Sequence, residues 1–69
     1  MMEIIEENNG FRLVKYTHCY RTDFGEFFYI VWIELQKIRK IIPNICIKAM
    51  LDTYNNRKHL LSILKRLAK

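Results

Sequence analysis

Four short clusters of turn-forming residues divide this sequence and limit the elements that it can form. Glycine and asparagine accept positive φ, and proline lacks a backbone donor, so each cluster is expected to end a regular element. No repeat or Ser/Gly-rich linker separates further units, so a single small domain over residues 1–69 is predicted. The clusters are Asn8-Asn9-Gly10, Thr22-Asp23-Phe24-Gly25, Pro43-Asn44 and Asn55-Asn56.

The first two clusters contain the residues of tight β-hairpin turns. Asn9-Gly10 is typical of a type I′ turn, which needs positive φ at both central positions. Asp23-Phe24-Gly25 resembles a type I turn that ends in a left-handed glycine. The flanking segments are rich in aromatic and β-branched residues, as strands are. We therefore predict a three-stranded antiparallel meander with strands at about 2–8, 11–21 and 26–33.

Apolar residues in the second half of the chain recur at helical spacing. A helix that begins at residue 35 would end before Pro43, because the residue before a proline avoids the α region. Asn44 can cap a second helix, and Asn55-Asn56 can separate it from a third. The predicted fold is therefore α+β, in which the meander is followed by two or three short helices at about 35–42, 44–54 and 57–68.

The centre of the sequence is also compatible with a different fold. No glycine or proline interrupts residues 26–42, although the run 27–33 has poor helix propensity. The alternative prediction is a mostly α chain with a helix over 23–42. It rests on six apolar residues whose spacing alternates between four and three, as in a heptad seam: Phe24, Phe28, Val31, Leu35, Ile38 and Ile42.

The apolar content exceeds what a domain of this size can enclose. Of the 69 residues 51% are apolar, whereas so small a domain can fully bury only about 15 to 20 side chains. The surplus must lie at the surface, which favours a homo-oligomer or another protein interface. The candidate protein-interface residues are Phe28, Tyr29, Trp32, Leu60, Leu64 and Leu67.

Charge is distributed unevenly along the chain. Residues 1–34 contain three basic and six acidic residues, whereas residues 35–69 contain nine basic residues and one acidic residue. Such asymmetry is typical of proteins that bind nucleic acid, anionic lipid or an acidic partner. It also fits a solvated helix face that has no partner. The candidate nucleic-acid contacts are Arg57, Lys58, Lys65, Arg66 and Lys69, followed by Lys37, Arg39 and Lys40.

No residue spacing typical of a catalytic or metal site is present. The soft metal-ligand types are His18, Cys19, Cys46 and His59, and none is paired locally as Cys-x-x-Cys or His-x-x-x-His. The sequence also lacks a Gly-rich phosphate loop and a Gly-x-Ser-x-Gly motif. We therefore expect no enzymatic activity, no metal or other cofactor, and no small-molecule substrate.

Three further features concern the origin and location of the protein. The longest apolar run, 27–33, is far shorter than the roughly 20 residues that span a bilayer as a helix. The acidic start argues against an export signal, and two cysteines without a partner motif suggest free thiols. Ile, Lys, Asn and Tyr make up 26 of 69 residues, a usage typical of AT-rich coding DNA. These features favour a cytoplasmic protein, in the host cell if it is a phage or viral accessory protein.

The functional hypothesis is a small non-enzymatic regulatory protein that binds a macromolecule through its basic C-terminal helices. Helices at 44–54 and 57–68 would resemble a helix-turn-helix in outline, and this favours DNA as the macromolecule. Any αα-hairpin has that outline, however, and the usual turn glycine is absent. An acidic protein is the other expected partner of the basic residues. The alternative function is a protein–protein interaction module, such as an inhibitor of a host protein, that uses exposed apolar and aromatic surface.

Overall fold

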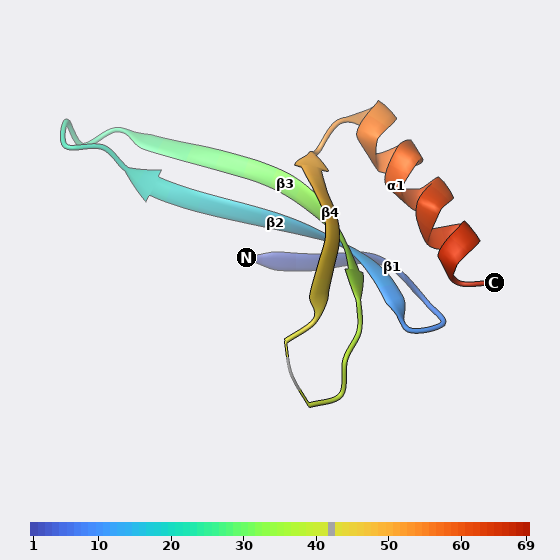
Figure 1. Ribbon diagram of the computed structural model, residues 1–69. Coiled ribbons are helices and arrows are strands. Elements are labelled where there is room, and N and C mark those ends of the chain that lie inside the picture. The colour runs from blue at the N-terminus through green and yellow to red at the C-terminus, as the bar shows by residue number, and fades with distance from the viewer. Residues whose placement is uncertain (42) are drawn as a thin grey trace.

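The computed structural model describes residues 1–41 and 43–69, which form one antiparallel β-sheet with an α-helix packed on it (Figure 1). The sheet order is β1-β2-β3-β4, so each strand pairs with its neighbour in the sequence. The predicted α+β class and the N-terminal meander are confirmed, but the sheet has a fourth strand and is followed by one helix. The elements are β1 (Met2–Asn8), β2 (Phe11–Arg21), β3 (Phe27–Lys37), β4 (Ile45–Leu51) and α1 (Tyr54–Leu67).

Two turns with positive backbone φ connect the first three strands. Asn9 has φ 47° and Gly10 has φ 84°, as a type I′ turn requires. Gly25 has φ 82° in the turn between β2 and β3. Because these turns depend on local residue preferences, the observed bounds of β1 and β2 agree with the predicted strands at 2–8 and 11–21.

The predictions of helices at 35–42 and 44–54 are wrong. The third strand was predicted to end at residue 33, but β3 continues to residue 37, and residues 38–41 form no helix. Ile42 lies outside the described residues. The segment 45–51 is strand β4, in which Met50 pairs with Ile33 and Lys48 pairs with Leu35. Pairing with β3 satisfies the backbone of this β-branched segment, and it outweighs the helical spacing of the apolar residues.

The alternative prediction, a helix over 23–42, is also wrong. Most of that range belongs to β3, which pairs with β2 along its whole length. The aromatic and β-branched residues that lower the helix propensity of 27–33 are well suited to a strand. The heptad-like spacing of apolar residues therefore does not correspond to a helical seam here.

The third predicted helix, 57–68, exists as α1 but begins at residue 54. Its N-cap is Thr53, whose Oγ1 accepts a hydrogen bond from the backbone N–H of Asn56 at 3.1 Å. The Asn56 side chain donates to the carbonyl of Leu51 at 3.0 Å. Because Thr53 supplies the cap, the Asn55-Asn56 pair lies inside the first turn and does not separate two helices.

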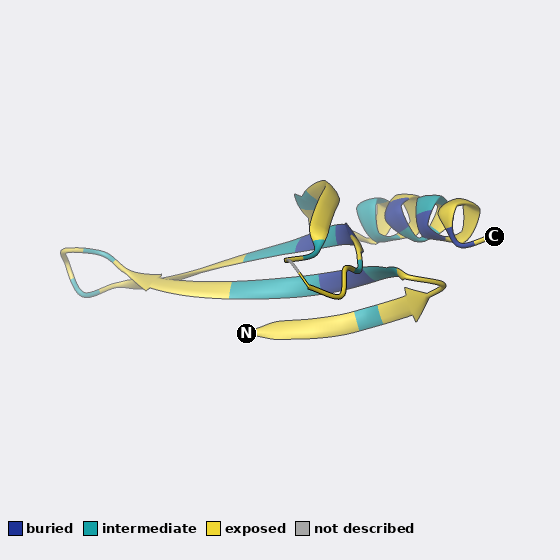
Figure 2. Cartoon of the chain, turned by 60° about the horizontal axis from the view of Figure 1, so that its bottom comes forward, coloured by how far each residue is buried: buried dark blue, intermediate teal, exposed yellow. Residues whose placement is uncertain are grey.

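One face of the sheet is covered by α1 and carries the hydrophobic core. The buried cluster combines side chains of β2, β3 and α1, and the helix lies on one side of the sheet only (Figure 2). No described element covers the opposite face, which we term the open face. Side chains alternate along a strand, so the neighbours of core residues point to the open face. The buried cluster consists of Leu13, Ile33, Leu35, Leu60 and Leu64.

The hairpin of β2 and β3 extends beyond the rest of the molecule. Pairing of β1 ends at Tyr16 and pairing of β4 ends at Trp32, whereas β2 and β3 remain paired as far as Arg21 and Phe27. Residues 18–30 therefore form a two-stranded projection, which we term the arm (Figure 1). The arm gives the protein its elongated form, 48 Å long and 15 Å thick.

Candidate nucleic-acid interface

The outer side of α1 carries a row of basic residues. Leu60, Leu64 and Ala68 are buried against the sheet, so the opposite side of the helix faces solvent. Basic side chains recur there and border a shallow surface depression together with Leu61 and Ser62. At 1.5 Å per residue the row is about 16 Å long. We term this row the α1 basic stripe, and it consists of Lys58, Lys65, Arg66 and Lys69.

The α1 basic stripe has no acidic counterpart in the described ranges 1–41 and 43–69. Both ion pairs found in these ranges involve Asp52, and neither includes a member of the stripe. The helix itself contains no Asp or Glu. Lys58 Nζ lies 5.3 Å from the centre of the Tyr54 ring, and Lys65 and Arg66 lie in the last turn, where the helix dipole favours cations. The stripe is therefore a uniformly positive surface.

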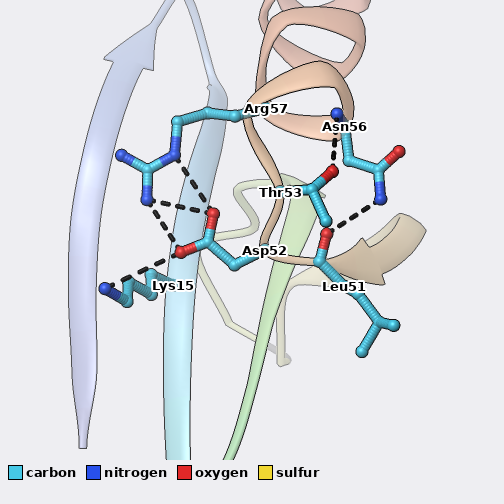
Figure 3. A network of polar contacts seen from close by, with 6 residues as sticks. All are labelled: Lys15, Leu51, Asp52, Thr53, Asn56 and Arg57. Carbon is cyan, nitrogen blue, oxygen red and sulfur yellow. Dashed lines mark hydrogen bonds and ion pairs between the residues drawn. The ribbon is translucent and has the colours of Figure 1, made fainter.

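Arg57, one of the predicted nucleic-acid contacts, is held by the protein itself. Its guanidinium donates to both carboxylate oxygens of Asp52, with Nη2–Oδ2 at 2.9 Å and Nε–Oδ1 at 3.2 Å (Figure 3). Lys15 Nζ approaches the same carboxylate to 3.7 Å. A phosphate would have to compete with Asp52 for Arg57. We therefore assign Arg57 to holding the start of α1 on Asp52, in the segment between β4 and α1.

Three further predicted nucleic-acid contacts lie outside α1. The backbone N–H of Ile38 donates to the carbonyl of Gly10 at 2.8 Å, and the side chain of Asn9 donates to the carbonyl of Ala68. The turn at Asn9 and Gly10 thus lies between residues 37–40 and the C-terminal end of α1. The exposed basic residues of segment 37–40 are Lys37, Arg39 and Lys40. They lie at the same end of the sheet as the C-terminal end of the α1 basic stripe.

The predicted interface leucines of α1 have different surroundings. Leu60 and Leu64 are completely buried against the sheet. They hold α1 on the sheet and offer no surface to a partner. Leu67 is 42% exposed at the C-terminal end of the helix, so it is the one member of this set that a partner could contact.

The predicted aromatic interface residues lie on β3. Phe28 and Tyr29 belong to the arm and are exposed. Trp32 is half-buried where the arm joins the rest of the sheet, and its indole N–H donates to Glu34 Oε2 at 2.7 Å. The structure therefore separates the predicted aromatic surface from the basic surface of α1.

The open face carries a polar network that the sequence did not indicate. Arg12 Nε donates to Gln36 Oε1 at 2.9 Å, and Gln36 Nε2 donates to the Tyr16 hydroxyl and to Glu34 Oε1, both at 3.0 Å. The rings of Tyr16 and Trp32 stack with centroids 5.4 Å apart. These residues come from two strands, and only the register of β2 against β3 brings them together.

The network alters the acidity of two groups on the open face. Burial raises the pKa of Glu34, but hydrogen bonds from Trp32, Gln36 and Cys46 lower it, and the net result is a pKa below the ordinary value. Burial and the neighbouring Glu34 carboxylate raise the pKa of the Cys46 thiol. Both shifts favour an ionised Glu34 beside a neutral Cys46 thiol.

Among the residues described, no cluster of His, Cys, Asp and Glu side chains is suited to a metal ion. No helix in that part of the chain is both long and apolar enough to cross a membrane. Comparison of the chain with protein-family models, curated proteins and solved structures finds no match.

Proposed function

We propose that the protein binds nucleic acid through the α1 basic stripe and that it contacts phosphates rather than bases. The observation that carries the proposal is the row of cations on the outer side of α1, which has no acidic partner in the described part of the chain. Lys and Arg side chains that neutralise phosphates release condensed counterions, and this is the main source of sequence-independent affinity.

The fold argues for backbone contacts rather than helix-turn-helix readout. Strand β4 occupies the position of the first helix in the predicted helix-turn-helix, so α1 has no helical partner to insert it into a groove. Instead α1 lies along the sheet (Figure 2). The residues of the α1 basic stripe are all exposed. Such a surface suits a phosphate backbone, and we include Lys37, Arg39 and Lys40 as secondary contacts at the end of the stripe.

The test is a salt titration of binding to a labelled mixed-sequence duplex, followed by fluorescence anisotropy. For the double variant K65Q/R66Q, the slope of log affinity against log salt should fall by roughly two units, because two phosphate contacts are lost. The single variants K65Q and R21Q form a matched pair, since each removes one positive charge and Arg21 lies at the tip of the arm. Equal effects of this pair would assign binding to net charge and refute the stripe.

A protein–protein interaction module is the second candidate function. It is supported by the exposed aromatic residues of the arm, particularly Phe28 and Tyr29. If a protein partner is bound there, F28A should weaken its binding by about 2 kcal/mol or more, as at an interface hot spot, while K65Q should have no effect. The reverse pattern would favour the α1 basic stripe.

A further inference from the structure

The arm exposes a strand edge that lacks the usual protection against pairing. Natural sheets guard exposed edges with charged residues, prolines or bulges. Residues 27–33 of β3 contain no charged residue, glycine or proline. The other edge of the arm, in β2, carries His18 and Arg21, and the outer strand β1 carries three glutamates. The β3 edge of the arm is thus the edge best suited to adding another strand.

A hydrogen bond at Val31 establishes which backbone groups point out of this edge. The N–H of Asp52 donates to the carbonyl of Val31 at 3.5 Å, so the polar groups of Val31 face the β4 side. In an antiparallel sheet both polar groups of a residue face one side, and the side alternates along the strand. The N–H and C=O groups of Phe27 and Tyr29 therefore point outward, and no described strand pairs with them.

We propose that two copies of the chain pair antiparallel through this edge, about a twofold axis at Phe28. In that register Phe27 of each copy exchanges two hydrogen bonds with Tyr29 of the other, which gives four in total. The two Phe28 side chains lie opposite one another on the open face, and aromatic cross-strand pairs of this kind stabilise a sheet. Val31 stays outside the paired segment, because Asp52 already occupies its outer side.

The charges of the two copies are complementary in this register. Pairing about Phe28 places the tip of each arm beside the end of β4 and the start of α1 in the other copy. The tip carries Asp23 and Glu26, and the guanidinium of Arg21 lies over the Phe27 ring with its central carbon 5.9 Å from the ring centre. The first turn of α1 contains no acidic residue and forms the positive end of the helix dipole, and Lys58 follows it in the next turn. The acidic residues of the tip thus meet Lys58 and the positive end of the α1 dipole twice, once on each side of the axis, while Asp52 at this place is already paired with Arg57 and Lys15.

A second copy of the chain carries the same exposed edge, so it is a suitable partner for the arm. Two-stranded hairpins are marginally stable in water, and this one carries exposed aromatic residues on both of its faces. Twofold pairing converts two such hairpins into a four-stranded segment and makes the contact self-limiting, because an isologous interface closes on itself. The proposal is independent of nucleic-acid binding and is tested without nucleic acid.

The experiment measures the mass of the purified protein by sedimentation over a micromolar concentration series. Wild type should approach twice the chain mass of 8.4 kDa. Y29P removes an outward N–H that bonds to no strand among the described residues, so it should be monomeric. C19P is the matched control, because Cys19 lies opposite Tyr29 on the other edge of the arm, and it should remain dimeric. A monomeric wild type, or equal behaviour of the two variants, would overturn the proposal.

A cross-link tests the register even if a proline disrupts the arm. In the background C19S/C46S the variant F28C carries the only thiol, and the proposed axis places the two copies of this thiol opposite one another within disulfide range. Mild oxidation should convert it to a covalent dimer, whereas R21C in the same background should remain largely monomeric. Cross-linking of R21C in preference to F28C would contradict the proposed register.

Discussion

Asp52 connects three elements through one carboxylate. It lies between β4 and α1 and accepts hydrogen bonds from Nε and Nη2 of Arg57. Lys15 of β2 approaches the same carboxylate (Figure 3). Its side chain is only 12% exposed, so the hydrogen bonds to Arg57 are partly shielded from water. Charge-assisted hydrogen bonds of this kind are stronger than neutral ones.

Replacement of this carboxylate should therefore destabilise the fold measurably. We expect D52N to lower the free energy of unfolding by about 1.5–3 kcal/mol, as for hydrogen bonds to charged groups. K15Q removes only the longer contact and should cost less than about 1 kcal/mol. Urea denaturation of both variants checks this prediction, and equal losses would mean that the Arg57 contact is not the dominant one.

Glu34 should make stability depend on pH in the acid range. Its pKa is lowered in the folded protein, so below the ordinary value the unfolded chain binds more protons than the folded one. The stabilisation by ionised Glu34 is then present above the ordinary pKa and is lost as the pH falls through the lowered folded pKa. Urea midpoints of wild type should fall more steeply with acid than those of E34Q. Parallel curves would contradict the assignment.

At the scale of elements, the attachment of α1 depends on the side of the helix that carries Leu60 and Leu64. Because Leu64 is completely buried, L64A should lower the free energy of unfolding by about 2–5 kcal/mol. L67A is the matched control on the same helix, and with Leu67 42% exposed it should cost less than about 1 kcal/mol. Thermal and urea unfolding measure the stability of both variants. Similar losses would mean that α1 does not pack on the sheet through Leu64.

The elements that could be predicted were those specified by neighbouring residues. Asn9 and Gly10 define a turn by themselves, so β1 and β2 were predicted with the observed bounds. Strand β4 was predicted as a helix because its apolar spacing suits either element, and only pairing with β3 decides between them. The start of α1 was misplaced for a related reason, since Thr53 becomes an N-cap only where β4 ends.

At the scale of the whole molecule, the charge asymmetry of the sequence becomes a spatial one. The acidic residues of β1 lie on an outer strand of the sheet, while the α1 basic stripe lies on the helix that covers its other strands. The members of the stripe could be predicted from helical spacing alone. The engagement of Arg57 by Asp52, the burial of Leu60 and the polar network of the open face could not, because each depends on contacts between separate elements.

Backbone amide NMR can distinguish nucleic-acid binding by α1 from binding by the open face. A short mixed-sequence duplex is titrated into labelled protein at about 0.15 M salt, the physiological range. Shift changes should concentrate at residues 58–69. The indole N–H resonance of Trp32, the single tryptophan, should not move, because this group stays bonded to Glu34. Shifts confined to Trp32 and the arm, or no shifts at all, would refute binding through α1.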